Sequence, residues 1–442
     1  MTQKEALDLL KAGYNIFLTG APGSGKTFLL NQYISYLKKN SVIVSVTAST
    51  GIAATHMGGT TLHSWSGLGI REKLDDQDVK YIADRSYLRK RIKNTNVLII
   101  DEISMIKAEQ FEAVDKICKY VKRSIRPFGG MQVICSGDFF QLPPVEKPDA
   151  EGNIKEIKFV VESDVWKNMD IKVCYLDEQH RSKDKKLEKI LTHIREDNPE
   201  KSKELLFASQ KKAKNLKHTP TKLYTHNVDV DSINGAELGK IKGPEFVYQM
   251  VCRGHEAVVD SLKKSCLAPE KLVLKKGAEV MFIKNNFEAG YVNGTQGQVI
   301  GFAGENAPVI QTNDGQKITA KYADWSIEEE NSVVAEISQI PLRLAWAITV
   351  HKSQGMNLDS AEIDLSRCFL EGMGYVALSR LRSLDGLKLV GINNLAFCVN
   401  KKATEFDKNF RKQSKKAQAE LKKIGEKEIK KRQELFLKYL AI

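Results

Sequence analysis

The octet GAPGSGKT at residues 20–27 contains the residue types that bind phosphate groups. Its glycines let backbone N–H groups converge on phosphate oxygens, and a helix that begins at its end adds a favourable dipole. The apolar run IFLT precedes the octet and a helical pattern follows it, which is the context that a phosphate-binding loop requires. We expect Lys26 to reach the β- and γ-phosphates and Thr27 to bind Mg²⁺. The octet therefore predicts a nucleoside triphosphate site built from Gly20, Ala21, Pro22, Gly23, Ser24, Gly25, Lys26 and Thr27.

Two acidic residues, Asp101 and Glu102, directly follow the apolar run NVLII. A carboxylate at the carboxyl end of a parallel strand faces the crevice in which ligands bind. Asp101 is predicted to bind Mg²⁺, directly or through water, and Glu102 to orient or deprotonate the attacking water. Gln141 follows a later apolar strand and suits contact with the γ-phosphate or that water, although a simple loop hydrogen bond fits its position equally well.

Arg181 and Arg380 follow apolar runs in the second half of the chain. A phosphate bound between two domains needs cations from the facing domain, and the planar guanidinium is the best such group. Because the chain has 68 Lys and Arg residues, each arginine taken alone is more simply a surface charge.

The elements that must position these residues alternate between apolar strands and helices over residues 1–175, which predicts an α/β fold with a parallel sheet covered on both faces. A charged helical stretch at 66–94 interrupts this first domain. A second α/β domain is predicted from residues 176–235 and 336–400. Between its halves, at 236–335, Asn293-Gly294 and Asp314-Gly315 predict hairpins and a small inserted antiparallel β-barrel. The basic tail, 401–442, has a helical pattern.

Composition narrows the class of protein. The net charge is +13, which fits either a nucleic-acid partner or simple solubility. The seven cysteines include no CxxC pair, which argues against a disulfide framework and a zinc site. No run of 18 apolar residues and no signal peptide is found, so a membrane partner is not expected and a cytoplasmic, bacterial setting fits best.

The motifs form an ordered set that resembles the petite-integration-frequency (PIF) family of superfamily-one DNA helicases over residues 3–385. The blocks that carry the resemblance are GAPGSGKT, VTASTGIAATHMGGTTLHSW (46–65), DEISM (101–105), PFGGMQVICSGDFFQLPPV (127–145), LDEQHR (176–181), AWAITVHKSQGMNLD (345–359) and YVALSRLRS (375–383).

The resemblance implies two tandem RecA-like domains with ATP between them and 5′-to-3′ translocation on single-stranded DNA. It implies that Arg181 and Arg380 are arginine fingers and that Gln141 senses the γ-phosphate. With Lys26 and Glu102, which their motifs already assign, these residues complete the predicted catalytic set. Gln3 would contact adenine, and Gly355 would line the nucleotide cleft. The insertion at 66–94 would carry a strand-separating wedge, and the β-rich insertion would close over DNA.

The DNA track is expected on loops that follow two strands. The first set, which rests mainly on the resemblance, is Thr47, Thr60, Thr61, His63, Ser64 and Trp65, although a lone tryptophan is usually a core residue. The second set, in TVHKSQG, is Thr349, His351 and Lys352, which the resemblance places between DNA and ATP. The stiff pair Pro143-Pro144 could couple Gln141 to the DNA groove.

These observations predict an ATP- and Mg²⁺-dependent DNA helicase with roles in replication, repair, recombination or telomere maintenance. Its predicted partners are single-stranded and forked DNA, with G-rich folds or RNA–DNA hybrids as further substrates, bound by a monomer or by a dimer on DNA. The alternatives are a translocase or remodelling ATPase that does not open duplexes, a RecD-like recombination helicase, and a binding protein with a degenerate phosphate loop.

Overall fold

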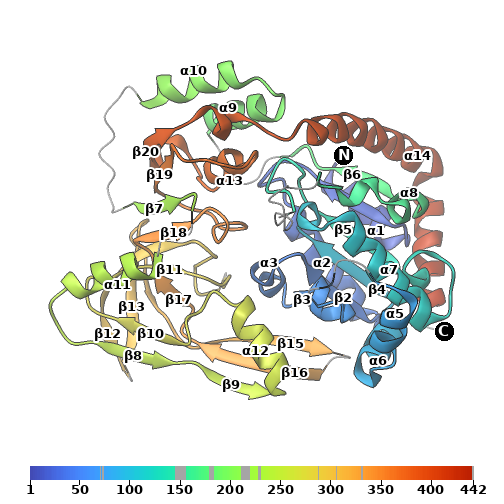
Figure 1. Ribbon diagram of the computed structural model, residues 1–442, viewed down its shortest axis with the longest axis horizontal. Coiled ribbons are helices and arrows are strands. Elements are labelled where there is room, and N and C mark those ends of the chain that lie inside the picture. Colours follow the sequence, from blue (N-terminus) through green and yellow to red (C-terminus); the bar gives the residue numbers. More distant parts are fainter. Residues whose placement is uncertain are drawn as a thin grey trace. The chain divides into compact units, whose positions relative to one another are not determined.

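The computed structural model describes residues 1–69, 71, 74–144, 156–178, 184–210, 220–226, 230–286, 288–304, 306–329 and 332–440. The chain divides into two compact units. The first consists of Met1–Arg181, Glu328–Ser332 and Glu405–Ile442, and the second of Ser182–Ile327 and Val333–Thr404. Figure 1 labels the elements of both.

The first unit is built on a six-stranded sheet whose order is β3-β2-β4-β5-β1-β6. Every neighbouring pair in it is parallel, as the near-continuous apolar runs predicted. The strands are β1 (Ile16–Thr19), β2 (Val44–Ala48), β3 (Thr60–Thr61), β4 (Val97–Asp101), β5 (Gln132–Ser136) and β6 (Lys172–Tyr175). Because β1 lies between β5 and β6, the strand order changes direction there, and this is where ligands bind in such sheets.

Helices connect these strands. They are α1 (Gln3–Lys11), α2 (Lys26–Lys39), α3 (Gly51–His56), α4 (Leu62–Ser66), α5 (Asp76–Ala83), α6 (Ser86–Asn94), α7 (Ala108–Lys122) and α8 (Asp164–Asn168), with 3₁₀ turns at Ile103–Met105, Pro127–Gly130 and Val160–Glu162. Within the charged stretch at 66–94, the helices are α5 and α6 over Asp76–Ala83 and Ser86–Asn94. Their apolar residues Val79, Ile82, Leu88 and Ile92 are buried, and both helices contact α7.

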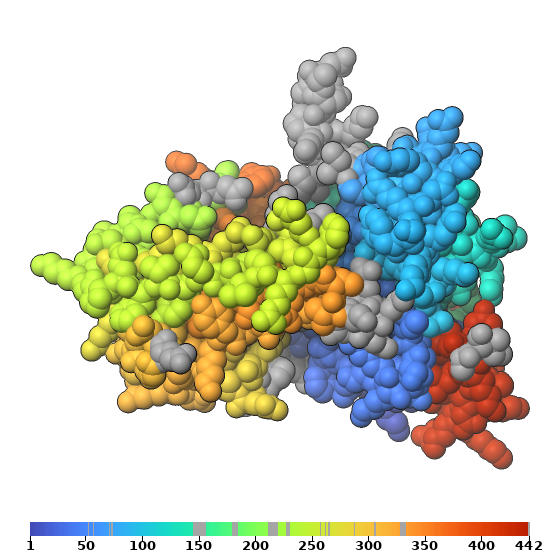
Figure 2. Space-filling model, turned by 90° about the horizontal axis from the view of Figure 1, so that it is seen from below, coloured from blue at the N-terminus to red at the C-terminus, as the bar shows by residue number. Residues whose placement is uncertain are grey.

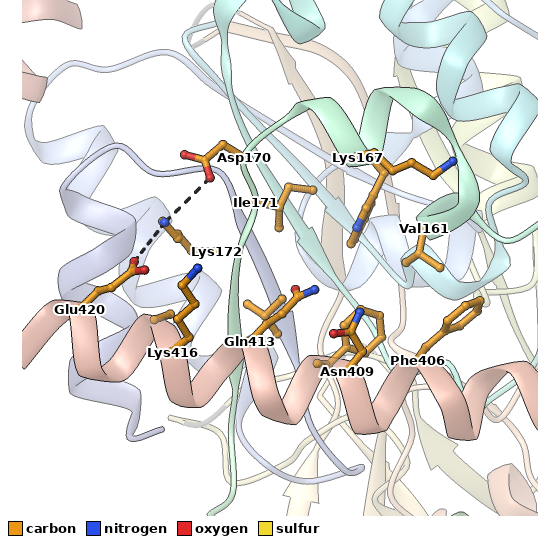
Figure 3. A pocket seen from close by; sticks show the side chains of 14 residues that line it. Val161, Lys167, Asp170, Ile171, Lys172, Phe406, Asn409, Gln413, Lys416 and Glu420 are labelled. Carbon is orange, nitrogen blue, oxygen red and sulfur yellow. Dashed lines mark hydrogen bonds and ion pairs between the residues drawn. The ribbon is translucent and has the colours of Figure 1, made fainter.

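The basic tail forms the helix α14 (Lys401–Leu440), which is interrupted at Gly425. Its apolar side packs on the first unit, where Phe410 lies 4.9 Å from Phe17 between ring centroids. Figure 3 shows the helix beside a pocket of about 530 Å³, at whose end Lys172 pairs with Glu420 at 3.1 Å. The helix therefore covers β6, the edge strand of the first sheet.

The second unit contains a four-stranded parallel sheet with the order β18-β7-β19-β20. Its strands are β7 (Thr221–Tyr224), β18 (Ala347–Thr349), β19 (Ala361–Leu365) and β20 (Leu387–Ile392), and its helices are α9 (Lys185–Arg195), α10 (Pro199–Gln210), α11 (Val230–Lys240) and α13 (Met373–Ser379), with 3₁₀ turns at Leu384–Gly386 and Asn394–Phe397. Asn234 ties α11 to β18 by bonding both backbone groups of Ala347, at 3.0 and 3.1 Å.

An antiparallel β-rich region interrupts this second sheet. Its strands form sheets of order β10-β8, β14-β13-β12-β11-β17 and β15-β16-β9. They are β8 (Phe246–Gln249), β9 (Val251–Gly254), β10 (Lys271–Leu274), β11 (Glu279–Phe282), β12 (Gln296–Ala303), β13 (Ala307–Thr312), β14 (Lys317–Thr319), β15 (Ala323–Glu329), β16 (Ser332–Gln339) and β17 (Leu342–Leu344), with the helix α12 (Glu256–Ser265) among them.

Strand pairing shifts the predicted limits of this insertion. Residue 236 falls inside α11 and residue 335 inside β16, and β17 pairs with β11, so the antiparallel region runs on to Leu344. Asp314-Gly315 forms the predicted turn between β13 and β14. Asn293-Gly294 does not form a two-residue hairpin. Gly294 has a φ of +91° at the end of a longer loop, where an added Cβ would lie 2.2 Å from the carbonyl oxygen of Asn357.

The cysteines are free thiols, and Cys118, Cys135, Cys174 and Cys368 are buried. Burial raises the pKa of the Cys174 thiol to about 12, so this group stays protonated and unreactive at neutral pH.

Within the described ranges, no helix is at once long enough and apolar enough to cross a lipid bilayer.

Candidate functional site

The octet at residues 20–27 connects β1 to the first turn of α2. Gly20, Gly23 and Gly25 have φ angles of +146°, +88° and +86°, which residues with a side chain rarely adopt. At Gly20 an added Cβ would also lie 2.5 Å from the carbonyl oxygen of Leu176. The loop therefore needs glycine for its backbone path as well as for space.

Lys26 is the first residue of α2, and its side chain turns back over the loop. Its Nζ donates to the carbonyl oxygens of Gly20 at 2.8 Å and Ala21 at 3.2 Å. Thr27, the next residue, is exposed. Gln3, in the first turn of α1, donates from Nε2 to the carbonyl oxygen of Ser24 at 3.5 Å. The structure thus places Gln3, the predicted adenine-contacting residue, beside the phosphate loop.

Asp101 and Glu102 stand at the carboxyl end of β4. Burial raises the pKa of the Asp101 carboxyl, and the positive charge of Lys26 acts in the opposite direction. Glu102 has a φ of +49°, in the left-handed region that costs a residue with a side chain on the order of 1 kcal/mol. Such strain persists where the surrounding structure holds a residue in place.

Buried polar atoms without hydrogen-bond partners gather around this end of the sheet. Within the described residues, Ser24 Oγ, Ser49 Oγ and Gln141 Oε1 have no partner. They follow β1, β2 and β5, which lie in one sheet. Leaving a buried polar group unpaired costs about 1–3 kcal/mol, so these atoms indicate a site shaped for a polar ligand.

The donor set fits Mg²⁺ bound together with phosphate. Thr27 offers a hydroxyl and Asp101 a carboxylate, and hard oxygen ligands of this kind suit Mg²⁺. No group of three His, Cys, Asp or Glu side chains forms a cluster among the described residues. A metal held here would therefore take its remaining ligands from phosphate oxygens and water, as Mg²⁺ usually does.

The strand β3 and the helix α4 carry four predicted DNA contacts at or near the surface. Thr60, Thr61 and His63 are partly exposed and Ser64 is exposed. Thr61 Oγ1 accepts a hydrogen bond from the Ser64 N–H at 3.2 Å and so begins α4. Burial lowers the pKa of His63, which keeps its imidazole neutral at pH 7 and makes it an N–H donor rather than a cation.

Burial corrects two other predictions of this set, Thr47 in β2 and Trp65 in α4. The Thr47 side chain is 0% exposed, and its hydroxyl donates to the carbonyl oxygen of Ile99 at 2.7 Å, so it cannot contact a phosphate. Trp65 is 2% exposed, so its ring belongs to the core and has no free face on which a base could stack. Pro143 and Pro144 are also buried, which leaves them able to stiffen the loop after Gln141 but not to form a surface for DNA.

The second unit holds the remaining predicted residues. Thr349 ends β18 and is buried, with its Oγ1 accepting from the Lys352 N–H at 3.3 Å, so its hydroxyl serves the turn rather than a phosphate. His351 and Lys352 are partly exposed, and burial lowers the pKa of His351. Gly355 follows with a φ of +78°.

Arg380 follows the last turn of α13 and is 2% exposed. Its Nε donates to the Val376 carbonyl oxygen at 3.0 Å and its Nη2 to Ser379 Oγ at 2.8 Å. A buried, bonded guanidinium is not the surface charge that its sequence alone suggested. Arg181 lies outside the described residues.

Sequence reasoning missed two residues that shape the site. The Ser49 N–H donates to the Asp101 carbonyl oxygen at 3.2 Å and so joins the ends of β2 and β4. Arg91 donates from Nη1 to the carbonyl oxygens of Ser64 at 3.2 Å and Trp65 at 3.0 Å, which braces α4. Ser49 lies in a block that the sequence singled out. Arg91 lies in a basic helix where nothing distinguishes it from its neighbours.

Comparison with known proteins shows the family to which this chain belongs. A family model described as PIF1-like helicase matches residues 2–200, and one described as the 2B domain of DNA helicase Pif1 matches residues 258–302. The chain is 40% identical to the ATP-dependent DNA helicase Pif1 of Psychrobacter sp. (strain PRwf-1) over an alignment that covers 99% of this chain and 75% of that protein. The chain belongs to the PIF1-like helicase family.

Solved structures of PIF1-like helicases agree with this assignment. Pif1 from Bacteroides sp in complex with ADP-AlF4 is 29% identical, with a TM-score of 0.78 over 93% of this chain and 96% of that chain. Pif1 from Bacteroides in complex with ADP-AlF3 and single-stranded DNA is 29% identical, with a TM-score of 0.60 over 93% and 96% of the two chains. The predicted α/β fold of two tandem RecA-like domains is confirmed, and the β-rich insertion overlaps the matched 2B domain.

Proposed function

We propose that this PIF1-like protein is an ATP-dependent DNA helicase that moves 5′-to-3′ along a single strand and opens the duplex ahead of it. The proposal rests on three buried polar atoms without hydrogen-bond partners, Ser24 Oγ, Ser49 Oγ and Gln141 Oε1. They follow strands of one parallel sheet, at the edge that also carries the phosphate loop and the acidic pair Asp101 and Glu102. The relatives named for ATP-dependent DNA helicase activity support it.

The chain's own residues divide the nucleotide chemistry among them. Lys26 leaves the carbonyl oxygens of its loop for the β- and γ-phosphates, and Gln3 contacts the base. Thr27 and Asp101 hold Mg²⁺, which when bound neutralises phosphate charge as the terminal group leaves. Glu102 accepts a proton from the attacking water, and Gln141, with its free Oε1, orients that water.

Two arginines supply the cations in this proposal. Arg181 and Arg380 act as fingers, which stabilise the charge that develops on the γ-phosphate. Arg380 must exchange its bonds to Val376 and Ser379 for phosphate oxygens, which makes its position sensitive to the bound nucleotide. Gly355 gives the backbone room beside the nucleotide.

In this proposal, the DNA strand contacts exposed and partly exposed side chains of both domains. Thr60, Thr61, His63 and Ser64 offer hydroxyl and imidazole donors to the sugar–phosphate backbone in the first domain. His351 and Lys352 do so in the second. The helices α5 and α6 form the wedge, and the 2B domain closes over DNA. Opening an average base-pair step costs about 1.4 kcal/mol, which one cycle of ATP-driven closure exceeds.

A strand-separation assay on duplexes with a single-stranded tail tests the proposal. The protein, with Mg²⁺ and ATP, should release a duplex that carries a 5′ tail and fail on one that carries only a 3′ tail. Lys26→Ala should abolish both hydrolysis and release. Strong DNA-stimulated hydrolysis without strand release would instead identify a translocase. Full turnover by Lys26→Ala would identify a binding protein with a degenerate loop.

A further inference from the structure

A basic groove lies on the first unit between the helices α5 and α6 and the end of α7. Its volume is about 1310 Å³, and the cationic residues among those that line it are Arg89, Lys93, Lys116, Lys119, Lys122 and Arg123. Asp76 is the acidic residue among them. Figure 2 shows the bright-blue surface of α5 and α6 standing beside the teal surface of this part of the unit.

Three of these cations already have partners that build the groove. Lys122 Nζ donates to the carbonyl oxygens of Lys93 at 2.9 Å and Thr95 at 2.8 Å, which joins the end of α7 to the end of α6. Lys119 pairs with the buried Asp115 at 2.7 Å, and Arg89 pairs with Asp84 at 2.9 Å. These contacts fix the walls of the groove in the folded protein.

The other three cations are free to bind a ligand. Lys93, Lys116 and Arg123 are exposed, and none has an ion pair with a carboxylate within the described residues. Holding these three like charges around a groove in which Asp76 is the lining carboxylate raises the local positive potential. A polyanion with regularly spaced charges relieves this repulsion, and its binding releases counterions.

The groove and the expected DNA track lie on different sides of α6. Arg89 and Lys93 are four residues apart and share one face of the helix, where they line the groove. Arg91 lies about 200° around the helix from Arg89 at 100° per residue. It reaches instead to the Ser64 and Trp65 carbonyl oxygens of α4. The helix α6 therefore separates α4, which carries Ser64, from the basic groove.

We propose that this groove binds the phosphate backbone of the strand that the helicase displaces. The proposal rests on the proposed function, because only a wedge that splits a duplex presents a second strand on the far face of α6. The tracking strand passes the side of α4, and the displaced strand enters the side lined by Lys93, Lys116 and Arg123. Holding it there opposes its re-pairing behind the wedge. Tyr120, which is 44% exposed in the same groove, offers a ring to an unpaired base.

Equilibrium binding to two DNA substrates tests this site. One is a duplex with a 5′ tail alone, and the other is the same duplex with a 3′ tail added on the complementary strand. The test variant carries Lys93→Gln, Lys116→Gln and Arg123→Gln. The control carries Lys422→Gln, Lys423→Gln and Lys430→Gln, which removes the same charge from exposed positions of α14.

We expect the unaltered protein to bind the two-tailed substrate more tightly, and the test variant to lose this preference while the control keeps it. At about 0.7 per phosphate contact on a single strand, the slope of log affinity against log salt for the two-tailed substrate should fall by about 2 in magnitude. A variant with Lys93→Arg, Lys116→Arg and Arg123→Lys keeps the charges and should keep the preference, which separates charge from folding.

Several results would overturn the proposal. One is a test variant that still prefers the two-tailed substrate. Another is an equal loss of affinity for both substrates, which would indicate a duplex contact. A third is a control variant that also loses the preference. An unaltered protein without any preference for the second tail would also overturn it. Unwinding by the unaltered protein is measured alongside. If unwinding is absent the proposed function fails, whereas unwinding without any tail effect refutes the groove alone.

Discussion

The backbone N–H of Tyr175 donates to Oγ of Ser414 at 3.0 Å, and this bond ties the edge strand β6 to the tail helix α14. The hydroxyl of Tyr175 accepts from Arg411 at 2.6 Å and donates to Asp407 at 2.9 Å. An edge strand normally presents unpaired N–H groups to solvent, and here a serine on a helix satisfies one of them. The tail is thus part of the first domain's fold.

Replacing Ser414 should destabilise the protein. Ser414→Ala leaves the buried N–H of Tyr175 without a partner, which costs about 1–3 kcal/mol in the free energy of unfolding. Denaturant unfolding followed by tryptophan fluorescence measures the change. Lys415→Ala, at the exposed neighbouring position, is the matched control and should change stability by less than about 0.5 kcal/mol. Equal losses in the two variants would show that the bond contributes nothing specific.

Glu102 should show a conflict between stability and activity. Its φ of +49° is strained for glutamate and free for glycine, so Glu102→Gly should raise the free energy of unfolding by up to about 1 kcal/mol. The same change removes the proposed base and should lower ATP hydrolysis by about 10²-fold or more. Glu102→Gln keeps the strain and should lose hydrolysis alone, as measured by phosphate release. Near-normal turnover in both variants would remove Glu102 from the chemistry.

Gly20 should tolerate no side chain. In Gly20→Ala the new Cβ would lie 2.5 Å from the Leu176 carbonyl oxygen and 2.8 Å from Ser24 Oγ. We expect a loss of about 1–3 kcal/mol in stability together with weaker ATP binding, measured by thermal unfolding with and without nucleotide. Gly301→Ala is the control, because its Cβ would meet nothing within 4 Å. A Gly20→Ala protein that gains as much stability from ATP as the unaltered chain would contradict this view of the loop.

Stability without DNA should fall as the pH drops below about 6.5. Burial lowers the pKa of His63 and His351 from their ordinary value of 6.5, so the unfolded chain takes up protons first. The unfolded state then binds more protons than the folded state, and the free energy of unfolding rises with pH through this window.

Substituting both histidines should flatten that dependence. The double variant His63→Gln, His351→Gln is compared with the unaltered protein by thermal unfolding between about pH 5.5 and 7.5, the range in which histidine titrates. His255→Gln serves as the control, because this histidine is exposed. A pH dependence that is unchanged in the double variant would mean that other groups control it.

Local sequence determined the parts of this protein that depend on short-range geometry. The apolar runs at β1, β4 and β5 form the buried strands that they predicted, and the octet GAPGSGKT between a strand and a helix has the glycines that its backbone path needs at positive φ. The position of Asp101 and Glu102 at the carboxyl end of β4 was predictable because they directly follow an apolar run that forms a parallel strand.

The tertiary structure decided which side chains are buried and which distant residues are in contact. Sequence could not show that Thr47 is buried, nor decide whether Trp65 lies in the core or faces DNA, because burial depends on elements that pack from elsewhere in the chain. It could not show that the tail's Ser414 closes the edge of β6, or that Lys93 and Arg123 meet in one groove. Packing between segments distant in the chain brings these residues together, and their spacing in the sequence carries no record of it.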